Sequence, residues 1–385
     1  MLLLHTADLH LGRTLHEREL LEDQGWALEA MVRAIAERKP AALLIAGDIY
    51  DRSIPTPEAI GLFDSFLAKA LAARPGLVVV AIPGNHDSAA RMAFGAGLFR
   101  GAGVHFRTRP GDCDEPIVVE AAGERVILWA LPFLGPGAFA DSEAGGPDGA
   151  AGMGSQAELF AEGVGRIRAR LEPGVCNVLV AHCFAAGGAT SESERGFVGL
   201  AEQVDLGLLE SFDYSALGHL HRMQRPTERS AYPGSPLAYS FGESGQEKGF
   251  LLVEVGAGGS RTEFVPVKPL RRMQRIEGPF SELSAPGAHG EHREDFIEAR
   301  LTDPLPVLNP ADPLRANFPN LLSVRQAAFE LQAPSTTAVE REERGLGAAM
   351  EDYLAFSEDM RGSAPSPAEL EVFSKLLAEA ERAAD

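Results

Sequence analysis

The first two-thirds of the chain alternate between short apolar runs and longer amphipathic segments. The short runs are continuous and flanked by polar residues, as in strands that are buried on both faces. They lie at residues 2–4, 42–45, 78–82 and 177–180.

Two longer segments repeat their apolar positions with helical spacing. The first covers 20–38, with Trp26, Met31 and Ile35 on one face. The second covers 57–73, with Ile60, Phe63, Leu67 and Leu71 on one face. The pattern predicts an α/β domain in which helices cover a sheet.

Changes in composition divide the chain further. Residues 135–154 are rich in Gly, Ala and Pro and predict a long loop, and a Gly-rich stretch at 255–260 predicts a hairpin turn. We therefore expect a main domain over 1–265 and a small α+β unit over 266–335, whose residues 296–301 form an alternating strand. Residues 336–385 are expected to be a linker and a helical tail.

One face of the tail is apolar, and two interpretations of it stay open. It is a terminal helix that docks on its own chain or frays, or it is a helix within 346–383 that packs on a partner. The residues of this face are Leu370, Phe373, Leu377 and Ala380.

The composition is that of a soluble protein with more than one structural unit. Of 385 residues, 45% are hydrophobic and 23% are charged. No apolar run approaches the roughly 20 residues of a membrane helix, and the N-terminus lacks the pattern of a signal peptide. The three cysteines are widely spaced and predict no disulfide framework. A cytoplasmic location without membrane contact is expected.

The formal net charge of −20 excludes one simple mode of action. A protein that holds nucleic acid through a broad basic surface has the opposite balance of charge. Binding of nucleic acid by this chain therefore requires local basic patches, bound cations or a basic partner.

Polar side chains suited to metal binding follow five of the apolar runs. Because ligand sites of layered α/β proteins form at the carboxyl ends of adjacent strands, we expect these side chains to meet at one sheet edge. They are Asp8, His10, Asp48, Asn85, His182, His219 and His221.

The spacing of these residues fits coordination. Asp8 and His10 are two residues apart, as are His219 and His221, so an extended backbone would place each pair on one side. Carboxylate, amide and imidazole donors without thiolate favour Mn²⁺, Fe²⁺ or Zn²⁺ over Ca²⁺ or a structural zinc. Glycines allow tight turns where the runs end, at positions 47, 84 and 218.

Each motif alone has a simpler interpretation. The Asp8–His10 pair is typical of a helix cap or surface turn, Gly47-Asp48 of an Asx-turn, and His182 of a hydrogen-bonded structural histidine. Their joint occurrence in this order, each after an apolar run, favours a metal site.

Together the motifs resemble those of calcineurin-like metallophosphoesterases. The resemblance implies an αββα sandwich with two metal ions roughly 3.5 Å apart. It also implies that His86 is a catalytic residue that is not a ligand and that Asp87 orients it; a purely structural turn is the alternative for His86. The implied ligands are Asp8, His10 and His221 for one metal, Asn85, His182 and His219 for the other, and Asp48 as a bridge.

The residues around the motifs are similar to those of the SbcD family of bacterial nuclease subunits. This similarity implies a DNA nuclease with double-strand exonuclease and single-strand or hairpin endonuclease activity, with two divalent ions and Mn²⁺ as the expected one. It implies a nucleoid-associated role in DNA repair, recombination and replication with an SMC-like ATPase of the SbcC type. The segments that carry the similarity are 5–13, 46–51, 84–88, 300–303 and 319–322, so that it covers about 1–330. The last two resemble the capping region of that family, which implies that the unit over 266–335 is a capping segment that recognises DNA.

The family resemblance further implies a homodimer through helices near 57–73 and 88–100. Phe63, Phe66, Met92 and Phe99 are equally compatible with an apolar interface and with the protein's own core.

DNA contacts are expected at Arg13, Arg52 and Arg222. Arg52 marks a departure, because related archaeal and eukaryotic nucleases carry a second histidine shortly after the bridging aspartate, where this chain has Asp51-Arg52. A DNA-binding module is an alternative function, with Arg222, Arg225 and Arg229, or the basic residues of 268–275, as its contacts. The net charge of −20 weighs against it unless these patches are spatially focused.

Two other functions remain open at this point. A metallophosphatase or phosphodiesterase for small molecules or nucleotides would use the same fold, although Gly-Asn-His-Asp, where phosphoprotein phosphatases have Gly-Asn-His-Glu, weighs against that class. A scaffold that lost its metals is the second alternative, and the complete ligand set weighs against it.

Overall fold

The computed structural model forms two compact units, Met1–Ala328 and Phe329–Asp385. Within the first unit it describes residues 1–135, 138–139, 154–189, 203–256 and 259–327. Within the second it describes short pieces of the tail, at 350, 353–354, 365–367, 369–370 and 372–375.

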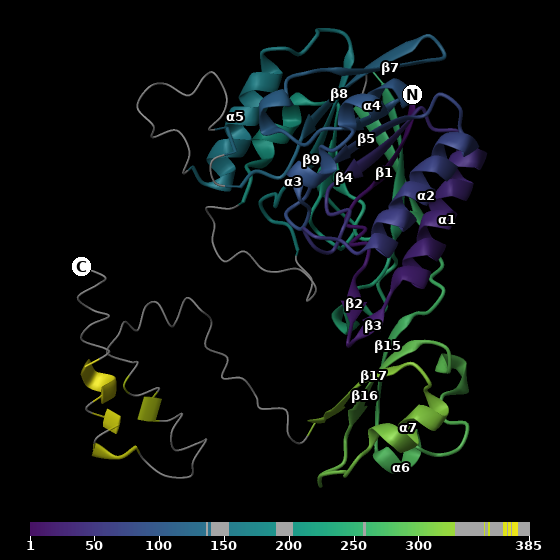
Figure 1. Cartoon of the computed structure of the whole chain (residues 1–385), viewed down its shortest axis with the longest axis vertical. Helices are drawn as coiled ribbons and strands as arrows, with labels where there is room; N and C mark the ends of the chain where they lie inside the picture. The colour runs from purple at the N-terminus through teal and green to yellow at the C-terminus, as the bar shows by residue number, and fades with distance from the viewer. Residues whose placement is uncertain are drawn as a thin grey trace. The chain divides into compact units, whose positions relative to one another are not determined.

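The first unit contains two six-stranded sheets (Figure 1). In the first sheet, parallel strands extend to one edge and two antiparallel-paired strands form the other; in the second sheet, antiparallel pairings flank the parallel strands on both sides. In spatial order the first sheet contains β14 (Gly259–Pro266), β13 (Gly249–Gly256), β1 (Leu2–Thr6), β4 (Ala42–Ala46), β5 (Val78–Ile82) and β6 (Val104–Phe106). The second contains β11 (Gln224–Thr227), β12 (Ser230–Tyr232), β10 (Tyr214–Gly218), β9 (Cys176–His182), β8 (Glu124–Leu131) and β7 (Ile117–Ala121).

The two sheets pack face to face. Leu44 and Val80 of the first sheet share a buried core with Leu128 and Val180 of the second. The predicted strands are buried on both faces because this core covers one face of each sheet and helices cover the other.

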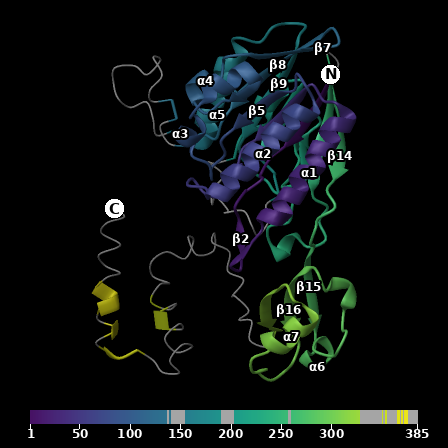
Figure 2. The same cartoon turned by 45° about the vertical axis from the view of Figure 1, so that its right-hand side comes forward.

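The helices form the outer layers of an αββα sandwich. The outer face of the first sheet packs against α1 (Leu21–Arg38) and α2 (Pro57–Ala73), which lie side by side (Figure 2). The second sheet packs against α5 (Gln156–Arg168) and the 3-10 helix η4 (Leu206–Ser211). The predicted layered α/β architecture is confirmed.

Local signals explain where α2 begins. Thr56 caps α2 by accepting a hydrogen bond from the Ala59 amide, and Pro57 occupies the first turn.

Two predicted core positions are wrong: Ile60 is 48% exposed and Trp26 is 44% exposed. Trp26 instead donates a hydrogen bond from Nε1 to the Lys268 carbonyl.

Residues beyond 266 form a small parallel sheet with its own core. Its order is β15 (Met273–Gly278), β16 (Phe296–Leu301) and β17 (Leu321–Gln326). The helices α6 (Phe280–Leu283) and α7 (Ala311–Asn317) contribute Leu283 and Leu314 to its core. β16 was expected to alternate, yet five of its six residues are buried because it is the central strand. The division into domains at 265 and 335 stays a prediction.

Shorter elements complete the described part of the first unit. The β13–β14 hairpin is present on either side of the Gly-rich stretch, with Gly256 paired to Gly259. The remaining elements are β2 (Thr14–Leu15), β3 (Arg18–Glu19), α3 (Ala89–Met92), α4 (Ala96–Phe99), η1 (Arg100–Ala102), η2 (Pro110–Asp112), η5 (Phe241–Glu243) and η6 (Gly290–His292).

Several predicted features lie outside the described residues. These are most of the 135–154 loop, residues 257–258, and most of 336–385 with Leu377 and Ala380. Within the second unit, Tyr353 and Phe373 stack with ring centroids 4.2 Å apart. Among the residues that are described, no helix is long and apolar enough to cross a membrane.

Candidate metal centre

The predicted donors lie at the ends of β1, β4, β5, β9 and β10. The first three strands belong to one sheet and the last two to the other. The expectation of a single sheet edge is therefore corrected, because the donors come from the carboxyl ends of parallel strands in both layers of the sandwich. Residues from the two sheets meet directly: the Asp8 carboxylate accepts a hydrogen bond from the His219 amide at 3.0 Å.

The backbone at these residues is not extended. Asp8, His10 and Asp48 have φ values of 54°, 42° and 48°, and His219 has 113°. Asp8 and His10 are brought together by this left-handed turn, so the predicted extended geometry is wrong. Non-glycine residues rarely adopt such angles, and they concentrate where surrounding structure holds a functional group in place. Here the Asp8 amide donates to the Gly47 carbonyl at 3.1 Å, and the His10 amide to the Asp48 carbonyl at 3.0 Å.

The three motif glycines serve two purposes. Gly47 has φ +91°, as predicted for a turn. Gly84 and Gly218 instead permit close approach: a Cβ on Gly84 would lie 2.1 Å from Asp48 Oδ1, and one on Gly218 would lie 1.8 Å from the Ala46 carbonyl oxygen.

One group of donors consists of Asp8, His10 and His221. Their nearest ligand atoms all lie within 4.8 Å of one another. The Nε2 atoms of His10 and His221 are 3.0 Å apart. Two imidazole nitrogens at this separation, next to a carboxylate, can face one cation together.

A second group consists of Asn85, His182 and His219. Asn85 Oδ1 lies 3.0 Å from His182 Nε2 and 3.1 Å from His219 Nδ1. The strands β5, β9 and β10 thus bring their donors to one point.

Asp48 lies between the two groups. Its Oδ2 is 3.6 Å from His10 Nε2 and 3.6 Å from His182 Nε2. Its other oxygen, Oδ1, accepts a hydrogen bond from the His86 amide at 2.9 Å. The carboxylate is therefore held in place and faces both groups.

A backbone oxygen fixes the orientation of the His182 ring, and carboxylates lie near the distal nitrogens of two other rings. His182 Nδ1 donates to the Ala46 carbonyl at 2.8 Å, which leaves Nε2 to face Asn85 and Asp48. His10 Nδ1 is 3.5 Å from Asp51, and His221 Nδ1 is 3.9 Å from Glu243. Such contacts at the distal nitrogen are typical of metal-binding histidines.

The electrostatics of the site suit a cation. Burial lowers the pKa of His219 to about 3 and that of His221 to about 4, and it also lowers the pKa of His182. These imidazoles are neutral at pH 7, the form that binds metals. The buried carboxylates of Asp8 and Asp48 lie among them, and buried negative charge requires compensation. Divalent cations fit this donor set.

His86 and Asp87 differ from the expected arrangement. The Asp87 carboxylate accepts hydrogen bonds from the amides of Ile49, Tyr50 and Gly84 at 2.9–3.0 Å, so it holds the backbone of the site. These amide donors lower the pKa of Asp87, but burial and the nearby Asp48 charge outweigh them and raise it to about 7. His86 Nδ1 instead contacts the Asp51 carbonyl oxygen at 3.0 Å. The expectation that Asp87 orients the His86 ring is thereby corrected.

The three expected DNA contacts have different surroundings. Arg13 is 17% exposed and pairs with Asp51 at 3.1 Å. The side chain of Arg52 is 64% exposed, with its nearest carboxylate, that of Asp51, at 3.9 Å. Arg222 is exposed. Their roles in DNA binding stay predictions.

The basic segment 268–275 is largely neutralised by acidic neighbours. Arg271 pairs with Asp23 at 2.7 Å, Arg272 with Asp295 at 2.8 Å, and Arg275 with Glu298 at 2.5 Å. This segment is therefore a weaker candidate for binding DNA than its sequence indicates.

Four residues near the site were not identified from the sequence. Asp51 lies beside His10 and Arg13, and Gln24 Nε2 donates to the His10 carbonyl at 2.7 Å. Glu243 lies near His221 Nδ1, and Lys248 Nζ donates a hydrogen bond to the His221 carbonyl oxygen. Only Asp51 carried a signal in the sequence, because it follows the motif residue Asp48 closely.

The residues considered for a dimer interface also divide into two sets. Phe63, Phe66 and Met92 are buried in the protein's own core. Phe99 is 45% exposed, and it lies close in sequence to Phe94 and Leu98, which are 87% and 85% exposed.

Comparison with known families agrees with this architecture. The model of the calcineurin-like phosphoesterase family matches residues 1–223, more than half of the chain. The protein belongs to the calcineurin-like phosphoesterases, a family that uses divalent metals. A second model, that of the SbcD C-terminal domain, described as the type 5 capsule protein repressor C-terminal domain, matches residues 269–353. Together the two matches support an SbcD-type nuclease.

Solved structures show only a weak likeness. The protein TT1561 of Thermus thermophilus is 15% identical with a TM-score of 0.39, and a hypothetical protein from the same organism is 13% identical with a TM-score of 0.36. Each match covers 69% of this chain and 99% of the other. Similarity at this level carries no conclusion about function.

Proposed function

We propose that the protein is a dinuclear metal-dependent nuclease that hydrolyses phosphodiester bonds of DNA. The observation that carries the proposal is the position of Asp48, whose Oδ2 is equally distant from the nearest histidine nitrogen of each donor group. A carboxylate with a cation on either side is the expected bridge of a two-metal centre. Asp8, His10 and His221 would hold one ion, and Asn85, His182 and His219 the other.

The residues around the ions have distinct roles in this proposal. Divalent ions, with Mn²⁺ expected, supply the Lewis acidity that activates water and offsets charge on the phosphoryl oxygens. His86 stabilises or protonates the departing sugar oxygen as a general acid. Asp87 keeps the backbone of residues 49, 50 and 84 in place, and with it the Asp48 carboxylate.

The capping segment supports DNA as the substrate. The match over 269–353 to the SbcD C-terminal domain favours a polynucleotide over a small phosphate ester. The net charge of −20 is compatible with this if the two ions and a partner supply the positive charge at the DNA. We propose an SMC-like ATPase of the SbcC type as that partner in DNA repair, with tail residues 346–383 as its docking segment.

Digestion of end-labelled DNA tests the function. The protein with Mn²⁺ should shorten linear duplexes and open hairpins, with and without the ATPase partner, and chelation by EDTA should stop both reactions. A para-nitrophenyl phosphodiester assayed in parallel distinguishes the alternative. Efficient turnover of the small ester without DNA cleavage would favour a small-molecule phosphodiesterase.

We further propose a homodimer, formed through the exposed apolar residues 94–99. Phe94, Leu98 and Phe99 replace Phe63, Phe66 and Met92 as interface candidates, because the latter are internal. Sedimentation of wild type and Phe94→Ser/Leu98→Ser tests this: the wild type should sediment as a dimer and the variant as a monomer. A monomeric wild type would contradict the proposal.

A further inference from the structure

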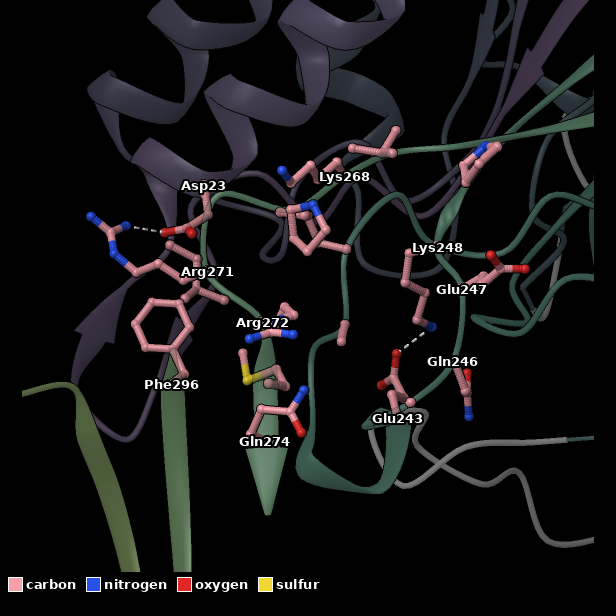
Figure 3. A pocket seen from close by; sticks show the side chains of 18 residues that line it. Asp23, Glu243, Gln246, Glu247, Lys248, Lys268, Arg271, Arg272, Gln274 and Phe296 are labelled. Atoms are coloured by element: carbon pink, nitrogen blue, oxygen red, sulfur yellow. Dashed lines mark hydrogen bonds and ion pairs between the residues drawn. The ribbon is translucent and has the colours of Figure 1, made fainter. Parts of the chain in front are cut away.

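A buried ion pair, Glu243–Lys248, lies next to His221, one of the proposed metal ligands. Glu243 is 1% exposed and Lys248 is 7% exposed, with 2.5 Å between Glu243 Oε2 and Lys248 Nζ. Figure 3 shows the two side chains pointing toward one another from opposite sides of a loop. Removing two charges from water is costly, so a pair at this depth adds little to stability by itself. Its contacts indicate another role.

Both members of the pair reach the same residue, His221. Lys248 Nζ donates a hydrogen bond to the His221 carbonyl oxygen at 2.7 Å. Glu243 Oε1 lies 3.9 Å from His221 Nδ1, on the side of the ring away from His10. The pair therefore holds the backbone of His221 by a hydrogen bond and places a carboxylate next to the distal nitrogen of its imidazole.

The pair is itself held by hydrogen bonds with three neighbouring residues. Ser240 Oγ donates to Glu243 Oε1 at 3.0 Å, and the Tyr239 amide to Glu243 Oε2 at 3.4 Å. Lys248 Nζ also donates to Ser235 Oγ at 3.2 Å. Charged groups satisfied in this way keep one arrangement, which makes them suitable to orient a ligand.

The same network extends to the capping segment. Ser244 Oγ, next to Glu243, donates to the Met273 carbonyl of β15 at 3.0 Å. A cavity of about 360 Å³ lies here, and its lining includes Glu243, Lys248, Met273 and Gln274 (Figure 3). The turn that carries Glu243 thus connects the start of β15 with His221.

We propose that Glu243 and Lys248 are positioning residues that fix His221 with Nε2 directed at the metal centre. This inference rests on the proposed two-metal function. A carboxylate near the distal nitrogen sets the tautomer and ring orientation of a metal-binding histidine, and its loss typically lowers metal affinity 10–100-fold. The effect should fall on the ion that His221 helps to hold.

Two double variants separate the ring contact from the buried charge. Glu243→Leu/Lys248→Met removes both charges and the acceptor for His221 Nδ1. Glu243→Gln/Lys248→Met also removes both charges but keeps an amide oxygen as an acceptor. Neither variant leaves an unpaired buried charge, so both are expected to fold. Glu247→Gln, an exposed change on the same loop, is the control.

Calorimetric titration of each full-length protein with Mn²⁺, together with its melting temperature, tests the proposal. The Leu/Met variant should bind one equivalent about 10–100-fold more weakly, with the other unchanged, and the Gln/Met variant should recover part of the loss. Equal affinities for wild type and the Leu/Met variant, or equal losses in both double variants, would overturn this inference alone. A wild type that binds no divalent cation would overturn the proposed function as well.

Discussion

His86 Nδ1 lies 3.0 Å from the carbonyl oxygen of Asp51, and this contact leaves Nε2 as the nitrogen for the proton transfer proposed for this residue. Because a carbonyl oxygen only accepts, Nδ1 carries the hydrogen and Nε2 is left to gain or release a proton. The ring also packs edge-on against His10 with centroids 4.7 Å apart, which places it next to the proposed ligands.

The first prediction concerns this histidine. His86→Ala should lower kcat for Mn²⁺-dependent cleavage of duplex DNA by about 10²–10⁴-fold, the usual contribution of a general acid. Metal content should stay at the wild-type value, because His86 is not among the proposed ligands. Single-turnover digestion and metal analysis measure the two effects, with His289→Ala of the capping segment as the control. Wild-type turnover in the His86 variant would exclude a catalytic role.

A second prediction tests the close approach at Gly84. The methyl group of Gly84→Ala would meet Asp48 Oδ1 at 2.1 Å and the Asp48 amide nitrogen at 2.4 Å, so the Asp48 carboxylate must move. A displacement of this size at a reacting centre costs about 10²-fold in rate. Gly61→Ala is the matched control, because its added methyl group meets nothing within 4 Å. Full activity in both variants would show that Asp48 tolerates the shift.

Arg52 should act on binding and not on chemistry. Its exposed guanidinium can neutralise one DNA phosphate, so Arg52→Ala should raise KM, leave kcat unchanged and reduce the slope of log K against log salt by about 1. Arg170→Ala is a suitable control, since Arg170 is 66% exposed and also lies near a single carboxylate at 3.7 Å. An unchanged salt slope for the Arg52 variant would remove this residue from the DNA contacts.

The stability of the metal-free protein should depend on pH through His5. This buried residue of β1 contacts the Tyr214 hydroxyl at 2.9 Å and the Leu217 carbonyl at 3.2 Å, and burial lowers its pKa to about 3. Because the unfolded chain takes up this proton near pH 6.5 and the folded protein does not, stability falls as pH drops from 6.5 toward 3. The slope from this residue is about 1.4 kcal/mol per pH unit.

Urea unfolding in EDTA at pH 7 and pH 5 measures this effect. His5→Asn should lose less stability than the wild type over that interval, since asparagine does not titrate. The difference between the two proteins isolates His5 from the other buried histidines. Equal losses in both would mean that His5 does not contribute.

The sequence predicted the strands, and the polar side chains that the fold brings together at their ends, for a physical reason. Each donor follows directly after a run of buried apolar residues, so that the pattern which identifies the strand also locates its end. The sheets themselves could not be predicted in this way. Nothing in the run before His182 distinguishes a strand of the second sheet from one of the first. The sequence therefore predicted one sheet edge for all the donors, whereas the structure places them at the strand ends of two sheets.

Residues without a motif were missed because only the fold brings them to the site. Glu243 follows His221 by 22 positions and lies within a polar segment that carries no recognisable motif. Trp26 fits a helical repeat, yet it faces the carbonyl of Lys268, more than 200 residues away in sequence. Contacts of this kind depend on how the capping segment meets α1, which no local pattern encodes.

Asp48 provides the most direct test of the two-metal site. Wild type and Asp48→Ala are titrated with Mn²⁺ and then assayed on end-labelled duplex DNA. The wild type should bind two equivalents and degrade the duplex, whereas Asp48→Ala should lose at least one equivalent and all detectable cleavage. An Asp48→Ala protein with near-wild-type Mn²⁺-dependent cleavage would contradict the proposed mechanism.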